Sequence, residues 1–565
     1  MNLKRSLFFV GLTCLSFNGS FAAEGNEKGI EYYRAELYNA AILFLNNQVT
    51  TTTGSEQAEA YYYIGESYAA LAKNDSAAIF YQKALDADAE YPYAYIGQGK
   101  LELLVNNQKS ANDLFKKAIG FAKKNPAIHT TVAEAYIHAQ LYDKANEALD
   151  QARSRDKKFS GIYVAEGDML RAQSKIGEAC AKYENAILFD KNDKVAYLKE
   201  ARVYKSINPK SALDILNRLI EVDPEYIPAY AELGDIYYND GYYPKALEAY
   251  SKFIAIPGVP VKYRMNYASI LYFQKEYDKS LVEIRRIMEK EPDNVVMHRL
   301  QAYNNYELGN YETGLEGMET FFKLIPPEQI ITLDYTYYGR LLEKNKKSDL
   351  AIEAFKQSLE LDSSKAEIYK EIAAAYNRMN LYPEAIQYYR SYFEKDANAP
   401  LLDLFNFGQT CYVGASQLTP AAPAEGAKKV VMSEEELDKR KNDSIQRMEY
   451  LQLADNIFEQ VSERSPDSFL GYLWRGHTQA SIDSEVTLGL AKPHYEKALS
   501  IMEASNADGR RNKDIVDAYR YLGYYYYLQD DMENARQCYE KILEILPDDE
   551  PSKQVLEATK GNKRR

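Results

Sequence analysis

The stretch YYYIGESYAALAKNDSAAIFYQKA at residues 61–84 sets the architecture of the chain, because the rest of the sequence repeats its pattern of small and large side chains. In this stretch, Ala77 follows Gly65 by twelve positions, and Tyr81 follows Ala77 by four. A small residue on one helix lets a partner helix approach closely, and a large residue one turn later fills the groove between them. The stretch therefore predicts a helical hairpin.

This pattern recurs at a nearly constant interval along most of the chain. The first small position is held in turn by Gly29, Gly65, Gly99, Ala133, Gly167, Ala201, Gly234, Ala268, Ala302, Gly339, Ala373, Gly408, Gly476 and Gly523. Prolines at positions 224, 292, 466 and 547 come twelve positions after the second small residue, where proline ends a helix. A period of this kind predicts an all-α array of about fourteen hairpins that grows in one dimension.

The repeat resembles the tetratricopeptide repeat, which has an aromatic residue, Leu-Gly and Tyr on its first helix and Ala, an aromatic residue, Ala and Pro on its second. The units that match best contain Tyr61, Ile64, Gly65, Tyr68, Ala77, Tyr81 and Ala84, and Tyr519, Leu522, Gly523, Tyr526, Ala535, Tyr539 and Pro547. The resemblance implies a right-handed superhelical solenoid, in which the first helices line a concave groove that binds other proteins.

The repeat register divides the chain into five segments. We predict a signal peptide at residues 1–22, repeat units at 23–415, an inserted loop with a helix extension at 416–448, further units at 449–550, and a capping helix with a basic tail at 551–565. Inside the insertion, Ser433 followed by Glu436 forms a capping box, which predicts that a helix begins there.

Residues 1–22 have the three parts of a secretory signal. Lys4 and Arg5 precede an apolar run at residues 6–17, and Ala22 lies before the expected cleavage site. We therefore expect an exported bacterial protein that is periplasmic or associated with the outer membrane, with no transmembrane segment in the mature chain. The alternative is a lipid anchor at Cys14, although Thr13 before it is larger than the residue usual in such a motif.

Composition and motifs argue against catalysis and against nucleic acid. The net charge of −14 gives no sequence-independent attraction to phosphate backbones. The five histidines lack metal-ligand spacing, and no HExxH, CxxC, P-loop or GxSxG pattern is present. The longest stretch outside the repeats is too short for a catalytic domain of ordinary size. We expect no enzyme activity, no cofactor and no metal.

One known recognition code of this repeat family can be tested on the sequence. Some members grip a peptide carboxylate with Lys and Asn at set first-helix positions. The equivalent pairs here are Tyr62 and Glu66, Ile96 and Lys100, Thr130 and Glu134, Val164 and Asp168, and Leu198 and Arg202. The carboxylate clamp is therefore absent.

An aromatic stripe in the middle of the array is the candidate binding site. Tyr238, Tyr272 and Tyr306 recur at the repeat interval on first helices, with Phe273 and Tyr303 beside them. Polar side chains about one turn away could orient a ligand, and these are Asp235, Ser269 and Arg299. Such a stripe suits an extended peptide or a sugar chain. The alternative is that the tyrosines only pack between neighbouring first helices.

These observations predict a non-catalytic scaffold of the periplasm or cell envelope that binds extended protein segments in its groove. Its expected partners are other cell-envelope proteins. The alternative function is binding of a glycan or a peptidoglycan fragment through the aromatic stripe.

Overall fold

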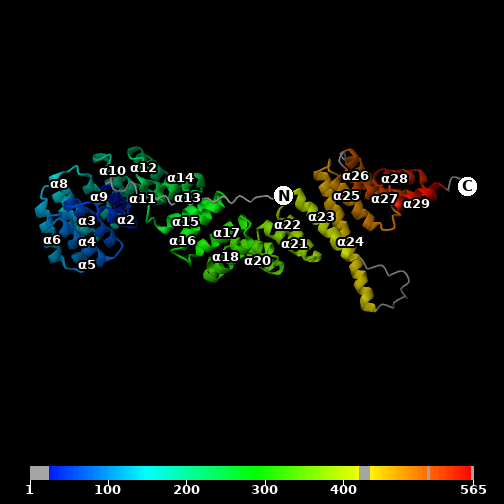
Figure 1. Ribbon diagram of the computed structural model, residues 1–565, viewed down its shortest axis with the longest axis horizontal. Helices are drawn as coiled ribbons and strands as arrows, with labels where there is room; N and C mark the ends of the chain where they lie inside the picture. The colour runs from blue at the N-terminus through cyan, green and yellow to red at the C-terminus, as the bar shows by residue number, and fades with distance from the viewer. Residues whose placement is uncertain (1–24, 419–432, 505–508, 561–565) are drawn as a thin grey trace, which may run out of the picture. The chain divides into compact units, whose positions relative to one another are not determined.

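The computed structural model of the protein describes residues 25–418, 433–504 and 509–560. Within these ranges helices are the only regular secondary structure, which confirms the predicted all-α superhelical solenoid (Figure 1). The chain forms two compact units, residues 1–308 and residues 309–565. The expected signal peptide and Cys14 lie outside the described residues.

The helices of the first unit are α1 (Glu27–Arg34), α2 (Tyr38–Gln48), α3 (Gly54–Ala70), α4 (Asn74–Ala87), α5 (Pro92–Leu104), α6 (Gln108–Phe121), α7 (Pro126–His138), α8 (Tyr142–Arg155), α9 (Ser160–Ala172), α10 (Ile176–Phe189), α11 (Lys194–Ile207), α12 (Pro209–Val222), α13 (Ile227–Asn239), α14 (Tyr243–Phe253), α15 (Val261–Phe273), α16 (Tyr277–Met288) and α17 (Val295–Glu307). They form eight successive hairpins, α1/α2 to α15/α16, followed by α17.

The helices of the second unit are α18 (Tyr311–Leu324), α19 (Thr332–Lys344), α20 (Ser348–Leu361), α21 (Ala366–Arg378), α22 (Tyr382–Lys395), α23 (Leu401–Gln417), α24 (Glu434–Arg464), α25 (Phe469–Ile482), α26 (Lys492–Ala504), α27 (Asn512–Leu528), α28 (Met532–Ile545) and α29 (Glu550–Lys560), with the short 3₁₀ helix η2 (Pro327–Gln329) before α19. The fourteen predicted first-helix positions fall on the odd-numbered helices from α1 to α27, which confirms the register.

Except for Gly29, each glycine at the first small position of the repeat lies beneath an aromatic ring of the second helix. A Cβ added to Gly99 would lie 2.4 Å from Phe115, and one added to Gly167 would lie 2.5 Å from Tyr183. These distances are far below the normal carbon–carbon contact of about 3.5–4.0 Å. The same contact occurs at Gly65, Gly234, Gly339, Gly408, Gly476 and Gly523. In these eight hairpins the aromatic ring leaves room only for glycine.

Hairpins with alanine at the first small position carry a slimmer side chain on the second helix. Leu149 lies at the aromatic position in the hairpin of Ala133, and Leu216 in the hairpin of Ala201, and both leucines are buried. Two units depart from this pairing. Gly29 faces Leu45, and the unit of Ala373 carries Tyr389. Small and large side chains are thus matched hairpin by hairpin in most units.

The first unit closes on itself, which the sequence did not predict. Arg202 on α11 donates a hydrogen bond of 2.8 Å to the carbonyl of Ala35, between α1 and α2. Lys194 on the same helix forms an ion pair with Glu31 of α1. Figure 1 shows α2 beside α11, although the two helices are far apart in the sequence. The stack therefore curves through a full turn, and its first helices surround an interior.

The insertion in the second unit extends a second helix, as predicted. Helix α24 is 31 residues long and begins at a capping box, in which the hydroxyl of Ser433 accepts from the amide of Glu436 and the carboxylate of Glu436 accepts from the amide of Ser433. Helix α23 ends at Gln417, so most of the predicted loop lies outside the described residues. Helix α29 occupies the place of the predicted capping helix and starts one residue earlier, at Glu550.

The three cysteines of the described chain are buried and free. They are Cys180, Cys411 and Cys538. Burial raises the pKa of the Cys538 thiol to about 11, so this group is an uncharged, weakly reactive side chain at neutral pH.

Candidate binding surface

The eight predicted site residues lie on three first helices of the first unit that pack side by side. Helix α13 carries Asp235 and Tyr238, α15 carries Ser269, Tyr272 and Phe273, and α17 carries Arg299, Tyr303 and Tyr306. The regular stacking of hairpins brings together residues that lie two repeats apart in the sequence.

The aromatic side chains form a continuous row across these helices. The rings of Tyr272 on α15 and Tyr303 on α17 are 6.0 Å apart, and Tyr272 also contacts Phe273 at 5.6 Å. Phe273 stacks on Tyr243 at 4.6 Å, and Tyr243 contacts Tyr238 of α13 at 6.2 Å. Offset or tilted pairs at such distances stabilise packing beyond the area they bury.

The members of the row differ in exposure. Phe273 is 47% exposed, whereas Tyr303 is only 4% exposed. Tyr238, Tyr272 and Tyr306 are half-buried, so each offers part of its ring to solvent. The row therefore joins neighbouring first helices and also presents an aromatic surface. Tyr303 contributes to the packing, and Phe273 contributes most to the surface.

The predicted polar residues are engaged to different degrees. Asp235 is buried and accepts hydrogen bonds from Tyr250 at 2.5 Å and from Lys205 at 3.1 Å. Its carboxylate thus stabilises the hairpin. Ser269 donates to the carbonyl of Met265. Arg299 is half-buried on α17. Contact of these residues with a ligand stays a prediction.

Two residues of the row were missed from the sequence. Tyr243 begins α14, and Tyr277, which contacts Tyr272 at 5.8 Å, begins α16. They lie one repeat apart, at the same point of successive hairpins. The periodicity could have revealed them, but second-helix starts were not expected to reach the first-helix surface.

A second set of polar groups lines the interior of the closed first unit. It consists of the charged residues that directly follow the small residue on the first helices and of the charged residues that pair with them. Lys100 pairs with Glu66 at 2.9 Å, and Lys199 pairs with Asp168 at 2.5 Å. Arg202 pairs with Glu232 at 2.7 Å. The interior is therefore built from ion pairs between neighbouring hairpins.

Tyrosine hydroxyls of the second helices complete several of these networks. Each hydroxyl passes over the glycine and donates to the carboxylate of the next residue, in the pairs Tyr81–Glu66 (2.6 Å), Tyr183–Asp168 (2.7 Å) and Tyr250–Asp235 (2.5 Å). Where that next residue is a cation, as at Lys100 and Arg340, the ring belongs to a phenylalanine, Phe115 or Phe355. The side chains of lysine and arginine have no hydrogen-bond acceptor for a tyrosine hydroxyl, which explains why these hairpins carry phenylalanine instead of tyrosine.

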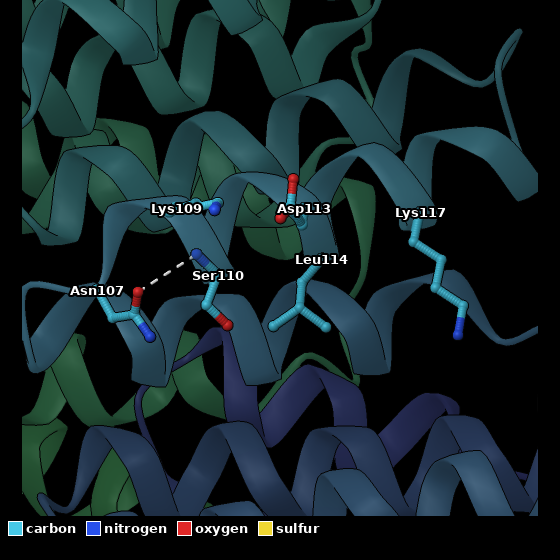
Figure 2. A pocket seen from close by; sticks show the side chains of 6 residues that line it. All are labelled: Asn107, Lys109, Ser110, Asp113, Leu114 and Lys117. Carbon is cyan, nitrogen blue, oxygen red and sulfur yellow. Dashed lines mark hydrogen bonds between the residues drawn. The ribbon is translucent and has the colours of Figure 1, made fainter.

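The described residues offer little else for a small ligand. Figure 2 shows a hollow on α6 whose lining comes from that helix and its N-cap, Asn107. The hydrogen bond drawn joins Asn107 to the amide of Ser110 within the same turn. Among the described residues, no group of three or more His, Cys, Asp or Glu side chains is placed to hold a metal ion. None of the described helices combines the length and the apolar character that a membrane span requires.

Comparison with known families agrees with this geometry. The family model described as tetratricopeptide repeat matches residues 516–549, and a second model of the same description matches residues 339–400. The chain is a tetratricopeptide repeat protein. Tetratricopeptide repeats generally mediate protein–protein interactions.

Relatives of this tetratricopeptide repeat protein match parts of the chain. The BBSome complex member BBS4 of Bos taurus is 24% identical over 40% of this chain and 50% of its own length. The human protein O-mannosyl-transferase TMTC1 is 23% identical over 37% of this chain and 24% of its own length. The chain thus spans half or less of these relatives. The C-terminal part of a TPR repeat-containing protein from Cytophaga hutchinsonii is 22% identical, with a TM-score of 0.40, over 52% of this chain and 99% of the solved chain.

Proposed function

We propose that this protein is a non-catalytic scaffold of the periplasm or cell envelope that binds extended segments of other proteins across α13, α15 and α17. The observation that carries the proposal is the continuous aromatic row with Phe273 as its most exposed ring. Exposed aromatic rings that adjoin one another on a protein surface mark sites of interaction.

An extended protein segment fits this surface better than a compact ligand. The accessible rings of Tyr238, Tyr272 and Tyr306 are spread over three successive first helices, and the sequence spacing between them is constant. Each tyrosine has an apolar ring and a polar hydroxyl, which suits a peptide that offers both side chains and backbone groups. Rigid first helices would hold these groups in place, which lowers the entropic cost of binding.

That the protein is non-catalytic is itself part of this proposal. The human relative is named as an O-mannosyl-transferase, but the match covers only 24% of that protein. The family is generally non-catalytic, and the two family matches of this chain are to the repeat itself. We therefore attribute binding to this chain and do not carry over the transferase activity.

The proposed location rests on the signal-like residues 1–22. If the protein is exported, N-terminal sequencing of the protein recovered from the cell envelope gives Ala23 as the first residue. A protein recovered from the cytoplasm with Met1 at its start would overturn this part of the proposal.

A matched pair of phenylalanines tests the binding surface. Phe273 ends α15 and is 47% exposed, whereas Phe121 ends α6 and is 42% exposed. Each stacks on one tyrosine, Phe273 on Tyr243 and Phe121 on Tyr95. Replacing either with Ala removes a half-exposed ring, with a similar loss of about 1 kcal/mol.

We expect Phe273→Ala to reduce the recovery of crosslinked partner proteins from intact cells at least tenfold, and Phe121→Ala to leave recovery unchanged. Equal recovery by both variants would overturn the proposed surface. Recovery of glycans without protein would replace the proposal with the glycan alternative.

A further inference from the structure

The second helix of the first hairpin, α2, is apolar on all sides. It carries six consecutive apolar residues, from Ala40 to Leu45. A helix of this kind needs partners on more than one face. Ile42 and Leu45 are buried with Ala60 and Ile64 of α3, in the next hairpin. A second apolar face is left for another partner.

That second face is covered by the closure of the first unit. Ala40 and Phe44 belong to one buried apolar cluster with Tyr226, Ile256 and Val259. Tyr226 directly precedes α13, and the other two lie in the link between α14 and α15. The hairpin α1/α2 is therefore held between its neighbour α3 and hairpins from much later in the chain.

Gly258 in the same link marks how closely the two parts approach. A Cβ added to it would lie 2.9 Å from the side chain of Leu43 and 3.1 Å from backbone atoms of Asn39 and Ala40. Its φ of +78° also favours glycine. Gly241, in the turn before α14, has a similar φ of +74°, but a Cβ added there meets nothing within 4 Å. The close contact of backbones is thus specific to Gly258.

The turn between α1 and α2 is more buried than the same turn in other hairpins. Leu37, which precedes α2, is 6% exposed, whereas Leu381 at the same repeat position before α22 is 38% exposed. Leu141, at this position before α8, is half-buried. Ala35 is fully buried, and its equivalent Ala139 is half-buried. The closure accounts for this additional burial.

The polar contacts of the closure are partly open to solvent and incompletely satisfied. The side chains of Lys194 and Glu31 are 27% and 30% exposed, and Arg202 meets Glu36, which is 45% exposed, at 3.3 Å. Ion pairs at such exposure contribute little to stability. The buried hydroxyl of Tyr226 has no hydrogen-bond partner among the described residues, which costs free energy. These features favour opening at the closure over separation of stacked hairpins.

We infer that the hairpin α1/α2 is a releasable latch, which covers within the same chain a docking face for an apolar helix with acidic side chains. The docking face is formed by α11, the start of α13 and the link between α14 and α15, with the contacting residues Lys194, Arg202, Tyr226, Ile256, Gly258 and Val259.

The chemistry of the partner follows from the latch that occupies the face. Leu37 and Phe44 supply its apolar contact, and Glu31 and Glu36 meet the two cations of α11. A helical segment of another protein with the same apolar and acidic residues would compete with the latch. Opening of the latch therefore controls whether this face is available.

This docking face is distinct from the surface of the proposed function. The latch covers the start of α13 and the link that precedes α15, whereas Tyr238 and Phe273 of the aromatic row lie at the ends of these two helices. The inference therefore does not depend on binding at the aromatic row.

The test uses the full chain and a labelled synthetic peptide of residues 25–50, which contains the latch. Leu37→Asp should open the latch, because the apolar contact excludes a charge, while aspartate is a favoured N-cap and preserves the start of α2. Leu141→Asp makes the same change before α8 and is the control. In fluorescence anisotropy, the peptide should bind Leu37→Asp at least tenfold more tightly than it binds the parent or Leu141→Asp.

Further changes in the Leu37→Asp protein test the docking face itself. Gly258→Ala should weaken peptide binding at least tenfold, because the added methyl group would meet the backbone of the bound peptide, whereas Gly241→Ala should leave binding unchanged. A peptide with Glu31→Gln and Glu36→Gln should bind at least threefold more weakly. Phe273→Ala should have no effect, so failure here is distinct from failure of the proposed surface.

Hydrogen exchange shows whether the latch opens while the docking face stays folded. In Leu37→Asp, exchange should become faster in α1 and α2 and stay unchanged in α11 to α15. If α11 to α15 also exchange faster, Leu43→Asp replaces this variant, since Leu43 is 49% exposed and faces Gly258. Its control is Ile79→Asp, at the same repeat position on α4 and 57% exposed.

Three results would overturn the inference. The first is unchanged exchange of α1 and α2 in both opened variants. The second is peptide binding that is equal in the parent and the opened variants, or absent from all of them. The third is peptide binding that Gly258→Ala leaves unchanged.

Discussion

Replacing Gly99 with Ala should loosen the hairpin of α5 and α6. The added methyl group would lie 2.4 Å from Cε1 of Phe115, 2.9 Å from Cδ1 and 3.1 Å from Cζ. Phe115 is buried and packs edge-on against Tyr136 at 5.2 Å, so its ring has no free space to enter. To restore normal contact, the two helices must separate by about 1 Å.

The magnitude follows from two opposing effects. Overpacking of a well-packed contact costs about 1–3 kcal/mol. Alanine in a helix interior is more favourable than glycine by about 0.5–1 kcal/mol, which offsets part of this cost. We expect Gly99→Ala to lower the local free energy of unfolding by about 1–2 kcal/mol.

The same hairpin provides the control. Gly120 lies on α6, and a Cβ added there meets nothing within 4 Å. Gly120→Ala should therefore raise local stability by about 0.5–1 kcal/mol. Hydrogen exchange measured by mass spectrometry on peptides from α5 and α6 suits this comparison, because long repeat arrays do not unfold in one step.

A compensating change tests the cause. Natural hairpins of this chain pair alanine with leucine, as at Ala133 and Leu149. Adding Phe115→Leu to Gly99→Ala should recover at least half of the lost stability, although Phe115→Leu alone is destabilising. If Gly99→Ala behaves like Gly120→Ala, or if Phe115→Leu brings no recovery, the close approach of ring and glycine does not govern the hairpin.

Three further predictions concern polar groups. Burial and the charge of Glu184 raise the pKa of Glu200 to about 7, so its folded state favours the protonated form and stability falls as pH rises from about 4.5 to 7. Glu200→Gln should therefore stabilise α10 to α12 at pH 8 by about 2–3 kcal/mol and have no effect at pH 4, and an unchanged pH profile of hydrogen exchange would refute this. Tyr250→Phe removes the 2.5 Å hydrogen bond to buried Asp235 and should lower the free energy of unfolding by about 1–2 kcal/mol. The control Tyr242→Phe, at an exposed site, should lower it by less than about 0.5 kcal/mol. Equal losses of stability in thermal unfolding would contradict the argument. Arg202→Met removes the bond to the Ala35 carbonyl and should speed amide exchange of α1 and α2 at least tenfold, while the exposed control Lys191→Gln should not, and unaltered exchange would show that the closure does not depend on this arginine.

The hairpin register could be predicted because it depends on local spacing. Gly65 and Tyr81 meet through the geometry of one hairpin, and later units repeat that contact. The pairing of glycine with aromatic rings was also present in the sequence, and it became clear only when the Cβ positions could be measured.

Other features could not be read from a repeat pattern. The contact of Arg202 with Ala35 spans 167 residues and depends on curvature accumulated over several hairpins. Asp235 was expected to orient a ligand because it lies one turn from Tyr238, but its partner Tyr250 comes from the following helix.

Photocrosslinking from position 273 is the sharpest test of the proposed binding surface. A photoreactive phenylalanine analogue would replace Phe273 in one strain and Phe121 in another, and intact cells would be irradiated. We predict defined crosslinks between position 273 and segments of other proteins, with none from position 121. Crosslinks of equal yield from both positions, or none from position 273 in cells that contain the folded protein, would contradict the proposal.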